Sequence, residues 1–131
     1  MSVPFVDLAA AFADIEAEVE PVLHDIMARG AFILGRELIE FESAFAGFCE
    51  AQSCAGVENG TTALSLSLKV LGIGAGDEVV VPANTFAAAA AAVCHSGAKL
   101  VFADVDPVTL TLDPAALEAA IGPDTKAVIP V

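Results

Sequence analysis

The sequence predicts an α/β fold, with helices, sheet and helices in three layers (α/β/α) around a mainly parallel sheet. In the second half of the chain, short and almost uninterrupted apolar runs alternate with helical patterns. Such runs are typical of strands buried on both faces, and the helices between them supply the crossovers that parallel strands need. Hydrophobic residues make up 56% of the chain, which is enough to build such a core.

Residues 1–52 are expected to form an N-terminal helical segment. Apolar side chains recur at helical spacing over residues 7–29, and Pro21 within this stretch predicts a kink or a new helix start. Gly30 is expected to end this helix, and a further helix is expected over residues 36–50.

Two apolar features of this segment call for interpretation. The loop of residues 30–35 carries a Phe-Ile-Leu sequence between two glycines. It either packs onto a partner subunit or a ligand, or is a simple buried connection, and both readings stay open.

In the helix of residues 36–50 an apolar stripe, which we interpret as core, is formed by Leu38, Phe41, Phe45 and Phe48.

Residues 53–131 alternate strands and helices. Strands are expected at residues 53–57, 78–82, 100–103 and 126–131, and helices at residues 61–71, 87–94 and 114–121. Asp113 is expected to cap the last of these helices, with Pro114 as its first residue. Residues 64–68 alternate like a strand, but Leu64, Leu68 and Leu71 also share one helical face. Because Gly72 suits the position just after a helix end, we interpret this stretch as a helix.

The charge balance excludes two classes of partner. The net charge is −13, from 18 acidic and five basic residues, so the chain has no basic surface for nucleic acid or for an anionic membrane. No apolar run reaches the roughly 20 residues that a membrane helix needs. The first residues show no signal-peptide pattern, and we expect a cytoplasmic protein.

No metal site is expected. The three cysteines follow no metal-ligand spacing and are interpreted as free thiols. Asp104 and Asp106 follow the strand of residues 100–103, and two carboxylates there are conceivable metal ligands. Asp is also common where a strand leads into a turn before proline, and we favour that interpretation.

The sequence Asn59-Gly60-Thr61-Thr62 joins an expected strand to a helix. It is a capped turn, or it is an anion site in which the first N–H groups of the helix and two hydroxyls bind a phosphate. In a parallel sheet this turn, the loop of residues 84–86 and residues 104–106 all lie beyond the carboxyl ends of the strands, where ligands bind. That placement favours the anion site.

Seven motifs, in order and in register, resemble the DegT/StrS family of nucleotide-sugar aminotransferases. The resemblance runs through all 131 residues and covers roughly the N-terminal third of such an enzyme. The motifs are Pro4-Phe5-Val6-Asp7-Leu8, Gly30-x-Phe32-Ile33-Leu34-Gly35, Asn59-Gly60-Thr61-Thr62-Ala63-Leu64, Gly72-Ile73-Gly74-x-Gly76-Asp77-Glu78-Val79, Val81-Pro82-Ala83-Asn84-Thr85-Phe86, Phe102-x-Asp104-Val105-Asp106-Pro107 and Thr125-Lys126-Ala127-Val128-Ile129-Pro130-Val131.

The resemblance implies pyridoxal 5′-phosphate (PLP) chemistry on the aspartate-aminotransferase-like fold (fold type I). Residues 53–131 would then be an incomplete large PLP-binding domain, truncated at its C-terminal end. The activity implied is transfer of an amino group, usually from glutamate, to a keto-sugar nucleotide by a homodimer. By position, Gly60, Thr61 and Thr62 match the turn that binds the cofactor phosphate, and Phe86 matches the aromatic residue that stacks on the pyridine ring.

Glu58 departs from the family pattern, which more often has a small or neutral residue before this turn. Pointing inward it would repel a phosphate, and pointing outward it would be harmless. In the family's sheet, later strands lie between the first strand and the next two. Residues 53–57 would therefore lack sheet neighbours here, and we expect weak stability or association through exposed apolar surface.

No catalytic residue of the family is expected in this chain. The Schiff-base lysine and its partners would lie beyond Val131, and Lys69, Lys99 and Lys126 are placed too far from the pocket to replace it. We therefore expect these 131 residues alone not to transaminate. Two alternatives stay open: a dehydratase of the same family, in which His replaces the lysine, and a non-catalytic regulatory module.

Overall fold

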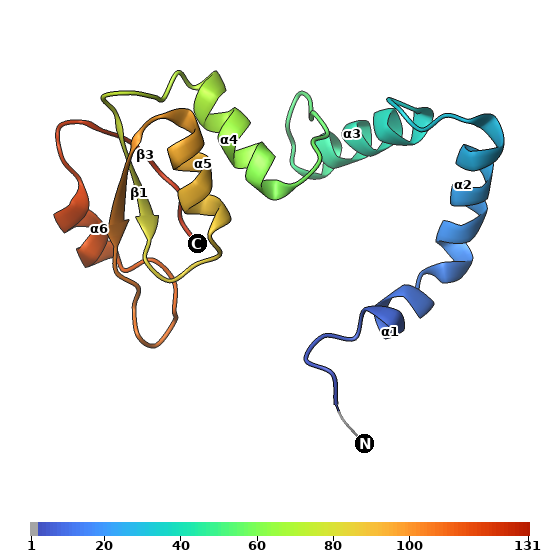
Figure 1. Cartoon of the computed structure of the whole chain (residues 1–131), viewed down its shortest axis with the longest axis horizontal. Coiled ribbons are helices and arrows are strands. Elements are labelled where there is room, and N and C mark those ends of the chain that lie inside the picture. The colour runs from blue at the N-terminus through green and yellow to red at the C-terminus, as the bar shows by residue number, and fades with distance from the viewer. Residues whose placement is uncertain (1–2) are drawn as a thin grey trace. The chain divides into compact units, whose positions relative to one another are not determined.

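The computed structural model describes residues 3–131 and divides into two compact units (Figure 1). The first unit ends at Gly56, and the second comprises Val57–Val131. The division expected after residue 52 concerns the domains of the complete fold and stays a prediction.

The first unit contains the helices α1 (Leu8–Ala13), α2 (Glu16–Arg29) and α3 (Arg36–Phe48). Of the two alternatives expected at Pro21, a kink or a new helix start, the new start is wrong, because Pro21 lies inside α2. The chain instead breaks before Glu16, and the carbonyl of Ile15 accepts hydrogen bonds from the N–H groups of Glu18 and Val19. Pro21 lies in the second turn of α2, where its missing N–H removes a single backbone hydrogen bond.

Gly30 ends α2, as the sequence predicts. It takes up the left-handed conformation, with a φ of 64°, that favours glycine. The N–H of Ala31 donates to the carbonyl of Ile26 at 3.2 Å, which satisfies one of the last free acceptors of the helix.

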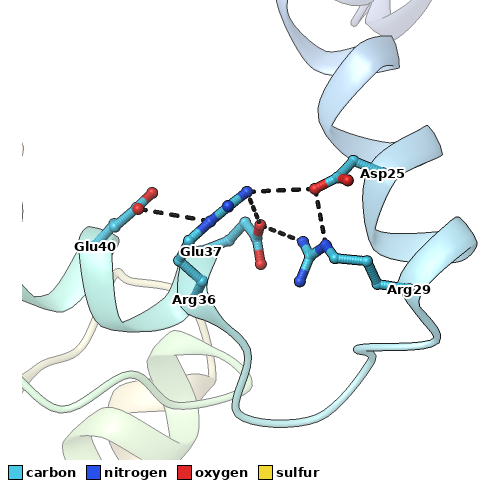
Figure 2. Close-up of polar contacts among 5 residues, drawn as sticks. All are labelled: Asp25, Arg29, Arg36, Glu37 and Glu40. Carbon is cyan, nitrogen blue, oxygen red and sulfur yellow. Dashed lines mark hydrogen bonds and ion pairs between the residues drawn. The ribbon is translucent and has the colours of Figure 1, made fainter.

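A network of ion pairs joins the end of α2 to the start of α3 (Figure 2). Arg29 donates to Asp25 at 2.9 Å and to Glu37 at 2.6 Å, while Arg36 donates to the same two carboxylates at 3.3 and 3.0 Å. Arg36 also lies 3.7 Å from Glu40. Because each arginine binds both Asp25 and Glu37, the network bridges the loop of residues 30–35.

Apolar side chains of the first unit are largely exposed. Phe32, Ile33 and Leu34 in the loop are 70%, 84% and 79% exposed, so the described residues do not bury this loop. The stripe interpreted as core is also exposed: Phe41 and Phe45 stack with their ring centroids 5.6 Å apart, yet both remain about half exposed. Ala46 is the only buried side chain among residues 3–56, so the stripe is not a core within this unit.

The second unit has the predicted alternation of helices and strands. Its elements are α4 (Gly60–Val70), β1 (Glu78–Pro82), α5 (Ala88–Ser96), β2 (Lys99–Ala103), α6 (Pro114–Ala120) and β3 (Thr125–Val128). The helical interpretation of residues 64–68 is confirmed, and Gly72, with a φ of 73°, follows the end of α4 as expected.

The three strands form a parallel sheet in the order β2-β1-β3. The strand expected at residues 53–57 is not formed, and these residues pair with no other strand of the described chain. A strand exists only with a hydrogen-bonded neighbour, and none of the three strands of the described sheet pairs with residues 53–57.

Helices cover both faces of this sheet. Helix α5 connects β1 to β2, and α6 connects β2 to β3 on the far side of β1. Because parallel crossovers are right-handed, two crossovers in opposite directions place their helices on opposite faces. Figure 1 shows α5 and α6 on opposite sides of the strands, and α4 packs against α5. The predicted three-layer α/β/α arrangement is confirmed.

The core lies between β1 and the layer of α4 and α5. Val79, Val80 and Val81 of β1 are completely buried. Helix α5 presents Ala89, Ala92 and Val93 to the core, and the two alanines allow its backbone to approach the sheet closely. In the described part of the chain, no helix has the length and apolar character that crossing a membrane would require.

The substitution Leu68→Ala tests this core. Leu68 is 4% exposed, and we expect the free energy of unfolding to fall by about 2–5 kcal/mol, as is typical for a truncated core leucine. The matched control is Leu71→Ala, since Leu71 follows the same helix but is 71% exposed, and a change below about 0.5 kcal/mol is expected. Urea denaturation followed by circular dichroism measures both. Equal losses would contradict the placement of Leu68.

The contribution of the ion-pair network to the stability of the fold is expected to depend on pH. The pKa of Glu37 lies below its ordinary value because its own backbone N–H donates to the carboxylate and because Arg29 and Arg36 are close to it. Because the pKa of Glu37 is lowered in the folded state, its ionised carboxylate contributes to stability above the ordinary pKa of glutamate. This contribution is lost as the pH falls through the lowered value. An NMR titration of the Glu37 carboxyl carbon checks this, and a midpoint at or above the ordinary value would refute it.

Candidate functional site

The candidate phosphate turn is the first turn of α4. Asn59, in extended conformation, caps the helix: its side-chain oxygen accepts a hydrogen bond from the N–H of Thr62 at 2.9 Å. The carbonyl of Asn59 accepts from the N–H of Ala63 at 3.1 Å. Asparagine is among the residues that cap helices best, which explains locally why the helix begins here.

Three donors of this turn remain available. The N–H groups of Gly60 and Thr61, and the hydroxyl of Thr61, donate to no acceptor among residues 3–131. They lie at the positive end of the helix dipole. A Cβ added to Gly60 would meet nothing within 4 Å, so the space beside this backbone is open. This donor set and this open space fit a phosphate group.

Glu58 lies against the same turn. The hydroxyl of Thr62 donates to the Glu58 carboxylate at 2.8 Å, so this carboxylate is bound to the turn itself. Glu58 is unusual for the family pattern, but that departure does not predict its bond to Thr62. The available signal was the spacing, since residues four apart become neighbours once a helix begins between them.

Phe86 lies in the loop between β1 and α5. Its side chain is 80% exposed, and its carbonyl accepts a hydrogen bond from the N–H of Ala89 at 3.3 Å as the helix begins. An exposed ring leaves a face free for stacking on a planar ligand.

The turn of residues 60–62 and the loop of Phe86 lie at one edge of the second unit. Helices α4 and α5 pack side by side and begin at the same side, which Figure 1 shows as the lower side. Strand β1 points to this side, and the chain runs from its carboxyl end into the loop of Phe86. The structure thus places the four predicted cofactor-binding residues at the carboxyl edge of the sheet. Their role stays a prediction.

The carboxylates of residues 104–106 are used in local turns. Asp106 accepts hydrogen bonds from the N–H groups of Thr109 at 2.7 Å and Val108 at 2.9 Å, and these bonds hold its pKa below the ordinary value. Asp104 accepts from the N–H of Val105 at 2.8 Å. Among residues 3–131, no three His, Cys, Asp or Glu side chains come together in a cluster that would hold a metal.

The three lysines lie away from the candidate turn. Lys69 is in the last turn of α4, at the opposite end of the helix from Gly60. Lys99 is the first residue of β2 and pairs with Glu78 at 2.6 Å, which raises the pKa of its amino group. Lys126 lies near the start of β3. The candidate turn therefore offers backbone and hydroxyl donors rather than cations.

Comparison with known proteins finds relatives both among curated sequences and among solved structures. A curated relative, dTDP-3-amino-3,4,6-trideoxy-alpha-D-glucose transaminase from Streptomyces venezuelae, is 43% identical over 98% of this chain and 34% of its own length. The structure of S. venezuelae DesV in complex with a ketimine intermediate matches with a TM-score of 0.91 and 43% identity, over 98% of this chain and 34% of that one. The structure of NtdA from Bacillus subtilis with bound cofactor PMP matches with a TM-score of 0.90 and 32% identity, over 98% and 30%.

The chain spans about a third of the length of the curated relatives that it matches. The model of the DegT/DnrJ/EryC1/StrS aminotransferase family matches residues 13–131. The parallel α/β structure of the second unit agrees with a part of the fold type I aminotransferases. The chain therefore belongs to the DegT/DnrJ/EryC1/StrS aminotransferase family.

Proposed function

We propose that this chain is part of a PLP-dependent aminotransferase that moves an amino group from glutamate to a keto-sugar nucleotide. Membership of the aminotransferase family and relatives named as nucleotide-sugar transaminases support this proposal. The observation that carries it is the first turn of α4, where two N–H groups and one hydroxyl are free beside an open space.

In this proposal the turn binds the cofactor phosphate. The N–H groups of Gly60 and Thr61 donate to its oxygens together with the Thr61 hydroxyl, in the field of the α4 dipole. Thr62 supplies a further hydroxyl when it releases Glu58. Asn59 keeps the turn in shape by capping the N–H of Thr62.

Phe86 orients the other end of the cofactor. Its exposed ring stacks on the pyridine ring and limits the directions in which that ring can turn. When bound, PLP supplies the electron sink that amino transfer needs. The part played by the described residues is to hold and orient this group.

The proposal extends to assembly and location. We assign the complete protein to a cytoplasmic homodimer. The apolar loop of residues 32–34 and the half-exposed Phe41 and Phe45 support the assembly, because contact with a second chain would bury them.

The substitution Gly60→Ala tests phosphate binding at this turn. The methyl group meets nothing within 4 Å and Gly60 has no positive φ, so the ligand-free fold is expected to be unchanged. The methyl occupies the space proposed for the phosphate, so the dissociation constant of PLP is expected to rise by about tenfold, or 1.4 kcal/mol. Titration followed by NMR of the Gly60 and Thr61 amides measures this in the native chain, and an absorbance titration measures it in the variant.

The matched control is Gly47→Ala in α3. A Cβ there also meets nothing within 4 Å, and no effect on PLP binding is expected. The proposal fails if Gly60→Ala binds PLP as tightly as the native chain, or if PLP leaves the amides of Gly60 and Thr61 unmoved.

A further inference from the structure

We propose that Glu58 lowers the affinity of this turn for phosphate by binding the Thr62 hydroxyl and by placing a negative charge beside the first turn of α4. The proposal rests on the proposed function, since it concerns the same phosphate turn. It makes Glu58 a residue that tunes cofactor binding without taking part in the chemistry.

The hydrogen bonds of Thr62 are the first part of the argument. Its hydroxyl donates to Glu58 at 2.8 Å, and its N–H donates to Asn59 at 2.9 Å. A phosphate that takes this hydroxyl must first break its bond to the carboxylate. One charged acceptor then replaces another, so the exchange brings little net gain.

The charge of Glu58 is the second part. A helix N-terminus favours a negative group, and the Glu58 carboxylate already supplies one at the first turn of α4. A phosphate monoester carries a charge of about −1.5 to −2 near neutral pH, so the two groups repel each other. Glu58 is exposed, and water and salt therefore limit the repulsion without removing it.

No cation offsets this charge in the described structure. Glu58 takes part in none of the ion pairs among residues 3–131. The basic residue of α4, Lys69, lies in the last turn of the helix. The turn is therefore a weakened phosphate site, and small phosphate ions are expected to bind it poorly unless other contacts add to their affinity.

Two substitutions separate charge from hydrogen bonding. Glu58→Gln removes the charge but keeps an acceptor for Thr62, whereas Glu58→Ala removes both. The dissociation constants of PLP and of inorganic phosphate are measured at low and high salt. We expect Glu58→Gln to tighten binding of both by about two- to fivefold at low salt, with a smaller gain at high salt.

Glu58→Ala is expected to tighten binding at least as much, because the Thr62 hydroxyl is also released. In a Thr62→Val background no hydroxyl remains to be released, so Glu58→Ala and Glu58→Gln are expected to give equal gains. Glu118→Gln is the control for net charge, since Glu118 is exposed on α6, and it is expected to leave both constants unchanged.

The outcomes separate this inference from the proposed function. If the native chain binds PLP at the Gly60 and Thr61 amides but neither Glu58 variant binds more tightly, the role of Glu58 is refuted and the phosphate turn stands. Equal tightening by Glu118→Gln also refutes it, because the effect would then come from net charge alone. If neither the native chain nor a Glu58 variant binds PLP, the proposed function fails and this inference fails with it.

Discussion

The arrangement of the second unit depends on the parallel pairing of β1 with β2 on one edge and β3 on the other. A central strand with two parallel neighbours must be buried on both faces, and Val79, Val80 and Val81 are completely buried. Parallel strands also share one carboxyl edge. The helix that follows β1 must therefore begin at that edge, and α4, which packs beside it, begins there too. The pairing places the loop of Phe86 at this edge, and the packing of α4 against α5 places the candidate phosphate turn at the same edge.

Features with a local cause could be predicted from the sequence. Gly30 and Gly72 adopt the left-handed conformation after helix ends, and Asp113 caps α6 through the N–H of Ala115. Each depends on a few neighbouring residues. Features that depend on distant parts of the chain were predicted less well. The expected strand at residues 53–57 needs a neighbouring strand, and none of the three described strands pairs with it; the stripe around Phe41 needs a surface to pack against.

The candidate site shows the same distinction at a smaller scale. Asn59 and Gly60 at the start of α4 could be predicted, because residue types and chain order indicate a capped turn at the ligand edge of the sheet. The side-chain rotamer of Glu58 could not be predicted. Two directions were compatible with the sequence, and only the structure shows the carboxylate bound to Thr62. This contact changes the chemistry of the turn, because one of its two hydroxyls is already in use.

The acidity of the chain explains why one carboxylate matters at this turn. The sequence has five basic residues, and the structure employs three of them elsewhere: Arg29 and Arg36 in the α2–α3 network, and Lys99 with Glu78. Lys69 and Lys126 lie away from the turn. Among residues 3–131, the groups that can bind an anion at α4 are therefore N–H groups, a hydroxyl and the helix dipole, which together supply less than a full positive charge. The single negative charge of Glu58 is comparable in size to this partial positive charge. Beside an arginine or lysine, the charge of Glu58 would be neutralised.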